Sequence, residues 1–79
     1  MMEFILIGTL GCHLCETAEQ ILQELGIAFE HAEIMEHPQW QTEFAWLIPV
    51  LWHQPSGLWL GWPFTAASAA DFYAEHKTA

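Results

Sequence analysis

The chain has 79 residues, 53% of them hydrophobic and 14% charged, and its single Lys and ten acidic residues give a formal net charge of -9. This composition excludes a disordered chain, and no apolar run reaches the roughly eighteen residues that a membrane span needs. Because Lys77 is the only Lys or Arg, the chain cannot form the cationic surface that nucleic-acid binding requires. We therefore expect a single domain over residues 1–79, with neither nucleic acid nor a membrane as its partner.

The first predicted element is a strand from Glu3 to Ile7, where the sequence is almost continuously apolar. Such a run is typical of a central strand that is covered on both faces. After a loop from Gly8 to Gly11 comes the motif Gly11-Cys12-His13-Leu14-Cys15-Glu16, which contains the only two cysteines. Chemistry in open α/β sheets tends to lie beyond the carboxyl ends of the strands, so this junction is the candidate functional site.

The cysteine motif leads into a first helix, predicted from Cys15 to Leu25, with Gly26 as its C-terminal cap. Its apolar positions follow helical spacing and are Leu14, Ala18, Ile21, Leu22 and Leu25. A second strand is predicted from Ala28 to Ile34, with Phe29 in the core. Its glutamates, Glu30 and Glu33, indicate an edge strand or a partly exposed face.

The second half of the chain predicts a short helix, a hairpin and a last helix. The short helix runs from Gln39 to Ala45 and is anchored by Trp40 and Phe44. Two apolar strands, Val50 to His53 and Leu58 to Gly61, flank a four-residue loop of turn formers, which predicts an antiparallel hairpin with Trp52 opposite Trp59.

The last helix is predicted to extend to His76 from Thr65, its N-cap, and Lys77 to Ala79 to form a disordered tail. The element order is therefore β-α-β-α-β-β-α.

The cysteine pair by itself permits three interpretations. Residues 1–12 have no positively charged start and too short an apolar segment for a secretory leader, so we expect a cytoplasmic protein. In a reducing compartment a lone Cys-x-x-Cys pair after a strand favours redox activity. Two inert core cysteines are the alternative. A zinc site is less favoured, because no second Cys-x-x-Cys supplies further thiolates, and we predict no bound metal.

The element order and three motifs together resemble the thioredoxin superfamily, and more closely the short glutaredoxin-like proteins. The motifs are Gly11-Cys12-His13-Leu14-Cys15, Ile48-Pro49-Val50-Leu51 and Gly61-Trp62-Pro63-Phe64. The resemblance implies an α/β, thioredoxin-like fold, with a four-stranded mixed sheet flanked by three helices. It also implies a cis peptide bond before Pro49, which packs beside the cysteines, and backbone hydrogen bonds from Ile48 to a bound thiol partner. The other prolines, including Pro63, are predicted to be ordinary breakers.

The resemblance further implies a dithiol-disulfide oxidoreductase that requires no bound cofactor. Cys12 is the predicted nucleophile, because the N–H groups and dipole of a helix N-terminus favour a thiolate and lower the pKa of such a thiol. Cys15, one turn further on, is the predicted resolving thiol. His13 is a candidate modulator, since an imidazolium would also favour the Cys12 thiolate, although an exposed His without this role fits the sequence equally well.

The predicted partner is a disulfide, either in a protein or in a low-molecular-weight compound. We expect the chain itself to be a monomer. Gly11, Ile48, Pro49 and Trp62 are the predicted substrate-binding residues, and Trp46 and Trp62 would favour a peptide or an apolar thiol. Glutaredoxins typically have Pro-Tyr between the cysteines, a basic residue near the motif and a Gly-rich turn that receives glutathione. This chain has His13-Leu14, no basic residue there, and Trp62-Pro63-Phe64, which disfavours glutathione.

The sequence leaves two other functions open. A binding module would keep the fold and hold a protein partner without turnover. An iron–sulfur cluster carrier would use Cys12 as a cluster ligand and would purify as a coloured dimer without oxygen.

Overall fold

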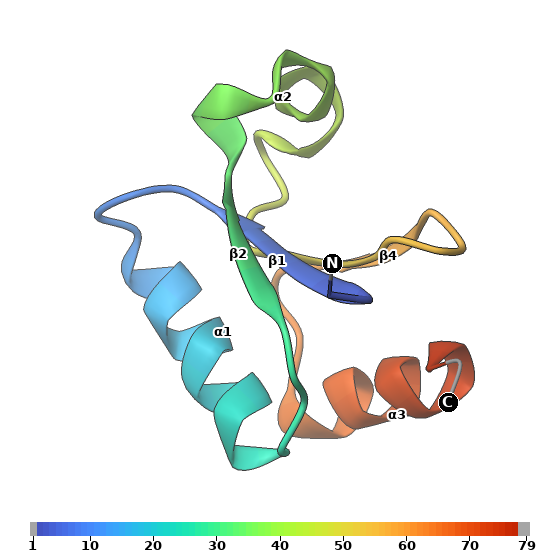
Figure 1. The fold of residues 1–79 in the computed structure, drawn as a ribbon. Coiled ribbons are helices and arrows are strands. Elements are labelled where there is room, and N and C mark those ends of the chain that lie inside the picture. The colour runs from blue at the N-terminus through green and yellow to red at the C-terminus, as the bar shows by residue number, and fades with distance from the viewer. Residues whose placement is uncertain (1, 78–79) are drawn as a thin grey trace.

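A four-stranded sheet with helices on both faces makes up the computed structural model, which describes residues 2–77 (Figure 1). The strands are β1 (Phe4–Gly8), β2 (Glu30–Glu33), β3 (Val50–His53) and β4 (Leu58–Gly61). The helices are α1 (His13–Glu24), α2 (Pro38–Phe44) and α3 (Ala66–His76), and a short 3-10 helix, η1 (Ile34–Glu36), follows β2. This arrangement confirms the predicted class and element order, to which η1 is an addition.

The sheet has the order β2-β1-β3-β4 and is mixed, because β1 is parallel to β2 and antiparallel to β3. The central strand β1 is buried at every position, as its apolar run predicts. Strand β2 lies at an edge and is exposed or half-buried throughout, as its glutamates predict. The hairpin of β3 and β4 has the predicted register, with Trp52 opposite Trp59.

Alternate residues of β1 contribute to two separate cores. Phe4 and Leu6 pack with α1 and α3 on one face of the sheet, whereas Ile5 and Ile7 pack with α2 and Ile34 on the other (Figure 1). Because successive side chains of a strand point to opposite faces, a doubly covered strand must be apolar at every position. The continuous run in β1 therefore fixes the three-layer arrangement.

Helix α1 begins at His13, earlier than the predicted start at Cys15. Cys12 has an extended backbone, and its Sγ accepts a hydrogen bond from the N–H of Cys15 at 3.1 Å, so the sulfur of its side chain serves as the N-cap. Apolar periodicity does not reveal a cap made by sulfur. The predicted apolar face is also too wide, because Leu14 is 51% exposed and Leu25 is 37% exposed.

The remaining boundaries follow from capping. Strand β2 ends at Glu33, whose carboxylate accepts the N–H of Met35 and starts η1. Helix α2 begins at Pro38, where a missing N–H is tolerated. Thr65 is the N-cap of α3, as predicted. Gly26 has a φ of 73°, the left-handed conformation of the predicted C-terminal cap.

Three further sequence expectations have mixed outcomes. Phe29 is half-buried against the core between α1, α3 and the sheet.

The Ile48–Pro49 peptide bond is cis, as the resemblance implies, but Trp62–Pro63 is cis as well, so Pro63 is not an ordinary breaker. Sequence cannot separate the two isomers because they differ by only about 0.5–1 kcal/mol in an unstructured chain. The predicted disordered tail begins at Lys77, but the N–H of Lys77 donates to the carbonyl of Tyr73. The rest of this tail, positions 78–79, lies outside the described residues.

The two leucines of α1 allow a test of this packing. Leu22 is 0% exposed and Leu14 is 51% exposed. We expect Leu22→Ala to lower the free energy of unfolding by roughly 2–5 kcal/mol, because it leaves a cavity beneath the helix. The matched Leu14→Ala should change it by about 0.5 kcal/mol or less. Urea unfolding followed by tryptophan fluorescence measures both, and equal losses would show that Leu14 also belongs to the core.

Candidate functional site

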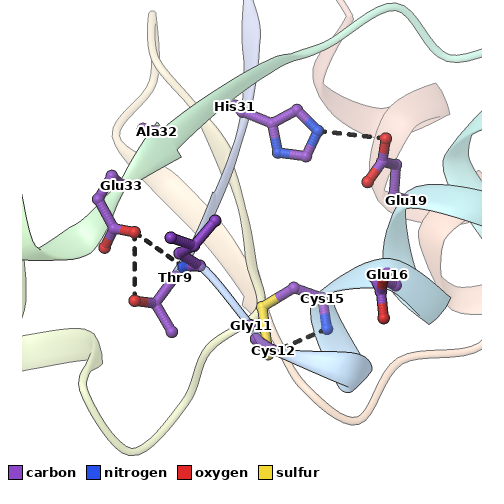
Figure 2. A pocket seen from close by; sticks show the side chains of 10 residues that line it. Thr9, Gly11, Cys12, Cys15, Glu16, Glu19, His31, Ala32 and Glu33 are labelled. Atoms are coloured by element: carbon purple, nitrogen blue, oxygen red, sulfur yellow. Dashed lines mark hydrogen bonds and ion pairs between the residues drawn. A yellow bond between two sulfur atoms is a disulfide. The ribbon is translucent and has the colours of Figure 1, made fainter.

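Cys12 and Cys15 form a disulfide at the N-terminus of α1, with their Cα atoms 5.2 Å apart (Figure 2). This separation lies within the range of about 4.4–6.8 Å that disulfides normally span. Cys12 is half-buried, whereas Cys15 is only 8% exposed. A reagent arriving from solvent therefore meets Cys12 first.

Gly8, the last residue of β1, lies directly against Cys15. A Cβ atom on Gly8 would be 2.7 Å from the Sγ of Cys15, closer than non-bonded atoms normally approach. Gly8 continues the alternation of Phe4 and Leu6 toward α1, and its missing side chain lets the helix bring the disulfide onto the strand end. Sequence reasoning placed Gly8 in a loop and missed this role. The available signal was a glycine on the helix-covered face of an otherwise bulky strand.

The strand register gathers the predicted residues at one end of the sheet. One row across all four strands consists of Ala32, Ile7, Val50 and Gly61. Beyond this row Gly8 pairs with Glu33, while Pro49 adjoins Val50 and Trp62 adjoins Gly61. Residues from distant parts of the chain thus share the sheet end that carries the disulfide.

Backbone hydrogen bonds connect the loop before Pro49 to its surroundings. The N–H of Trp62 donates to the carbonyl of Leu47 at 3.0 Å, which joins the end of β4 to this loop. The N–H of Ile48 donates to the carbonyl of Phe44 at 3.1 Å. A thiol partner bound at Ile48 would therefore have to use a different backbone group of that residue.

A hollow of about 330 Å³ opens beside the disulfide, between the β1–α1 loop, the first turns of α1 and β2 (Figure 2). Of the predicted site residues, Gly11, Cys12 and Cys15 line this hollow, whereas Ile48, Pro49 and Trp62 do not. Its lining includes three carboxylates, Glu16, Glu19 and Glu33, and the imidazole of His31. An anionic ligand entering the hollow would meet carboxylates and no Lys or Arg.

Glu33 is the lining residue with the most polar contacts to the loop. Its Oε1 accepts the Thr9 hydroxyl at 3.2 Å and the N–H of Leu10 at 2.9 Å (Figure 2). Its Oε2 accepts the N–H of Met35 at 3.0 Å. The N–H groups of Met35 and Leu10, with a smaller effect of Thr9, lower the pKa of Glu33. The carboxylate is therefore ionised at neutral pH. Sequence reasoning used this residue only as a sign of an edge strand.

His13 lies in the first turn of α1 with its side chain 96% exposed, and its Nδ1 is 3.0 Å from Oε2 of Glu16. The imidazole thus has a carboxylate partner on its own helix. Its predicted effect on Cys12 stays a prediction.

The two tryptophans predicted to face a partner differ from each other. Trp46 is 96% exposed, in the loop between α2 and β3. Trp62 is half-buried, and its ring packs against Phe64 with centroids 5.1 Å apart. Trp46 is therefore the more accessible of the two.

His53, which lies outside the cysteine motif, has a packing role. It is buried, with Nε2 2.8 Å from Oε1 of Glu3 and Nδ1 2.7 Å from Oγ of Ser56. Within residues 2–77 no three His, Cys, Asp or Glu side chains are grouped so that they could hold a metal ion. None of the helices in this part of the chain is long and apolar enough to cross a membrane.

Comparison with known proteins identifies the family. Residues 3–72 match the Glutaredoxin-like domain (DUF836). The structure is similar to the X-ray structure of Northeast Structural Genomics target protein XcR50 from X. campestris, with a TM-score of 0.79 and 29% sequence identity, covering 91% of this chain and 96% of that chain. No curated protein matches. The family match includes both cysteines and extends over most of a thioredoxin-like fold, so the protein belongs to the Glutaredoxin-like domain family.

Proposed function

We propose that this protein is a thiol–disulfide oxidoreductase in which Cys12 is the nucleophile and Cys15 the resolving thiol. The observation that carries the proposal is the unequal exposure of a bonded pair at a helix N-terminus, with Cys12 half-buried and Cys15 8% exposed. The attacking thiol must reach an external disulfide, whereas the resolving thiol needs to reach only Cys12. A protein that merely binds a partner requires neither the bond nor this difference.

The reaction proceeds by two exchanges. In the reduced protein the Cys12 thiolate attacks one sulfur of a partner disulfide, whose S–S bond breaks, and one half of the partner leaves as a thiolate that takes a proton from water. The Cys15 thiolate then attacks the Cys12 sulfur and expels the other half of the partner as a second thiolate. Two electrons pass to the partner, and the Cys12–Cys15 disulfide is the product. A dithiol, or two monothiols, returns the pair to the reduced state.

The start of α1 supports the Cys12 thiolate in this scheme. The N–H of Cys15 points at the Cys12 Sγ from 3.1 Å, and the helix dipole places partial positive charge at the same end. Because Lys77 is the chain's only Lys or Arg and lies after α3, these backbone groups replace a basic side chain. They favour the ionised thiol over the neutral one.

We infer that the partner is a protein or small disulfide without strong negative charge. The support is the net charge of -9 and the carboxylates of Glu16 and Glu19 beside the disulfide, which repel anions such as glutathione within a Debye length of about 10 Å. Gly11 in the hollow, with Ile48, Pro49 and Trp62, is the proposed substrate-binding set. A reducing cytoplasm, the proposed location, would regenerate the dithiol.

The two cysteine variants should fail in different ways. Cys12→Ser removes the nucleophile and should reduce disulfide reductase turnover to the background rate. Cys15→Ser should still attack but should accumulate a mixed disulfide between Cys12 and the partner. Thiol trapping and mass spectrometry in redox buffers, with a small aromatic disulfide as substrate, distinguish these results. Turnover retained by Cys12→Ser would contradict the mechanism.

Gly8→Ala should slow the closure of the Cys12–Cys15 disulfide more than the initial attack, because the added methyl group meets the Cys15 Sγ. We also expect a loss of about 1–3 kcal/mol in the free energy of unfolding from overpacking. Gly61→Ala is the control, since the atoms nearest to its Cβ, at the same sheet end, belong to Trp59 and Leu47 and not to a cysteine. Stopped-flow measurement of both steps would contradict the role of Gly8 if the two variants slowed closure equally.

His13→Ala should raise the pH midpoint of Cys12 alkylation by a few tenths of a unit, the size expected for an exposed charge. Glu16→Gln removes the carboxylate that pairs with the imidazole and should lower the midpoint. The rate of iodoacetamide alkylation measured across pH gives both values. If His13→Ala titrates like the parent protein, His13 has no electrostatic role.

A further inference from the structure

Glu33 connects the edge strand of the sheet to the loop that precedes the nucleophile. It is the last residue of β2 and stands beside Gly8 in the parallel register. From this position its Oε1 accepts two hydrogen bonds from the loop, one from the Thr9 hydroxyl at 3.2 Å and one from the N–H of Leu10 at 2.9 Å (Figure 2). One carboxylate oxygen thus binds two successive residues of the loop.

Thr9 extends this connection to Cys12. The N–H of Cys12 donates to the carbonyl of Thr9 at 3.3 Å, which closes a turn over Leu10 and Gly11. Gly11 has a φ of 79°, a conformation that glycine adopts without steric cost and that such turns require. The side chain of Thr9 is therefore held by Glu33 while its carbonyl holds the backbone of Cys12.

The carboxylate is itself held in place at its second oxygen. Oε2 accepts the N–H of Met35 at 3.0 Å, at the start of η1. With both oxygens bonded, the carboxylate cannot rotate without breaking a hydrogen bond. The same donors lower the pKa of Glu33, so these contacts involve the stronger, ionised acceptor at neutral pH.

A carboxylate beside a nucleophilic thiol has an electrostatic cost. A nearby negative charge disfavours the thiolate and raises the pKa of a thiol. The position of Glu33 next to the Cys12 loop is therefore not explained by activation through charge. Its hydrogen bonds to the loop would instead favour the thiolate and lower the pKa of the thiol, by aligning Cys12 with the N–H groups at the start of α1.

We propose that Glu33 is a positioning residue for Cys12, because by holding the Thr9–Leu10 loop it keeps the Cys12 Sγ against the N–H groups that begin α1. This proposal rests on the proposed function, in which Cys12 is the attacking thiol. It assigns to β2 a part in the site that the cysteine motif does not reveal.

The test is the pH midpoint of Cys12 alkylation by iodoacetamide, measured in a Cys15→Ser background so that Cys12 is the only thiol. Glu33→Ala should raise the midpoint by about 0.5–1 pH unit, the effect of losing alignment with a helix N-terminus. Glu33→Gln keeps an amide oxygen for Thr9 and Leu10, and its midpoint should stay at or below that of the parent. Glu30→Ala removes the same charge from an exposed position of β2 and should leave the midpoint unchanged.

A second variant keeps the test valid if Glu33→Ala folds poorly. Thr9→Val preserves the shape of the side chain and the Thr9 carbonyl but removes the hydroxyl donor, so it should raise the midpoint by a smaller amount. If Glu33→Ala and Glu33→Gln lower the midpoint equally, Glu33 acts only as a charge and the proposal is wrong. Midpoints unchanged in both Glu33→Ala and Thr9→Val would overturn it as well.

The alkylation midpoint does not depend on turnover, so the two proposals can fail separately. A parent protein that never closes a reversible Cys12–Cys15 disulfide in redox buffers would contradict the oxidoreductase function, whatever the Glu33 variants show. A parent that turns over normally, with an alkylation midpoint insensitive to Glu33→Ala, would contradict the positioning role alone.

Discussion

The close approach between Gly8 and Cys15 is the constraint on which the site depends. Helix α1 can lie this near to the end of β1 only where the strand has no side chain, since any Cβ on Gly8 would be 2.7 Å from the Cys15 Sγ. The approach buries Cys15 against the strand and leaves its partner Cys12, one helical turn away, half-buried beside the hollow. The unequal exposure of the two cysteines is therefore a property of the helix–strand packing and not of their spacing alone.

In the proposed function, backbone dipoles take the part of the basic residue that glutaredoxins typically have near the cysteine motif. The chain has one Lys and no Arg, and carboxylates surround the hollow, so stabilisation of a Cys12 thiolate depends on the N–H groups at the start of α1. Hydrogen bonds from fixed backbone groups weaken steeply with poor geometry. A site of this kind depends on the placement of its loop, which is the physical reason for the positioning role that we propose for Glu33.

The two sides of the site differ in chemistry. On the side of β2 the hollow is acidic, with Glu16, Glu19 and Glu33 in its lining. On the side of β3 and β4 the sheet end continues into Pro49 and Trp62, and Trp46 in the adjoining loop is 96% exposed. In the proposed function an apolar partner would approach along this second side, whereas the carboxylates of the hollow would attract a cationic partner.

The sequence by itself determined the order of the elements and the limits of β3, β4 and α3, because these depend on local patterns, whereas the predicted limits of the other helices and strands differ by one or two residues. The hairpin of β3 and β4 has its predicted bounds, since alternating apolar residues and a turn-forming loop specify it, and Thr65 and Gly26 are the predicted caps. The predicted start of α1 was wrong because the sulfur of Cys12 acts as its N-cap. Only the tertiary structure decided the roles of Gly8 and Glu33. Glu33 forms hydrogen bonds with residues 24 and 23 positions before it in the chain, and Gly8 lies against Cys15 in α1. Both sets of contacts arise from packing between separate elements, which no local sequence pattern records.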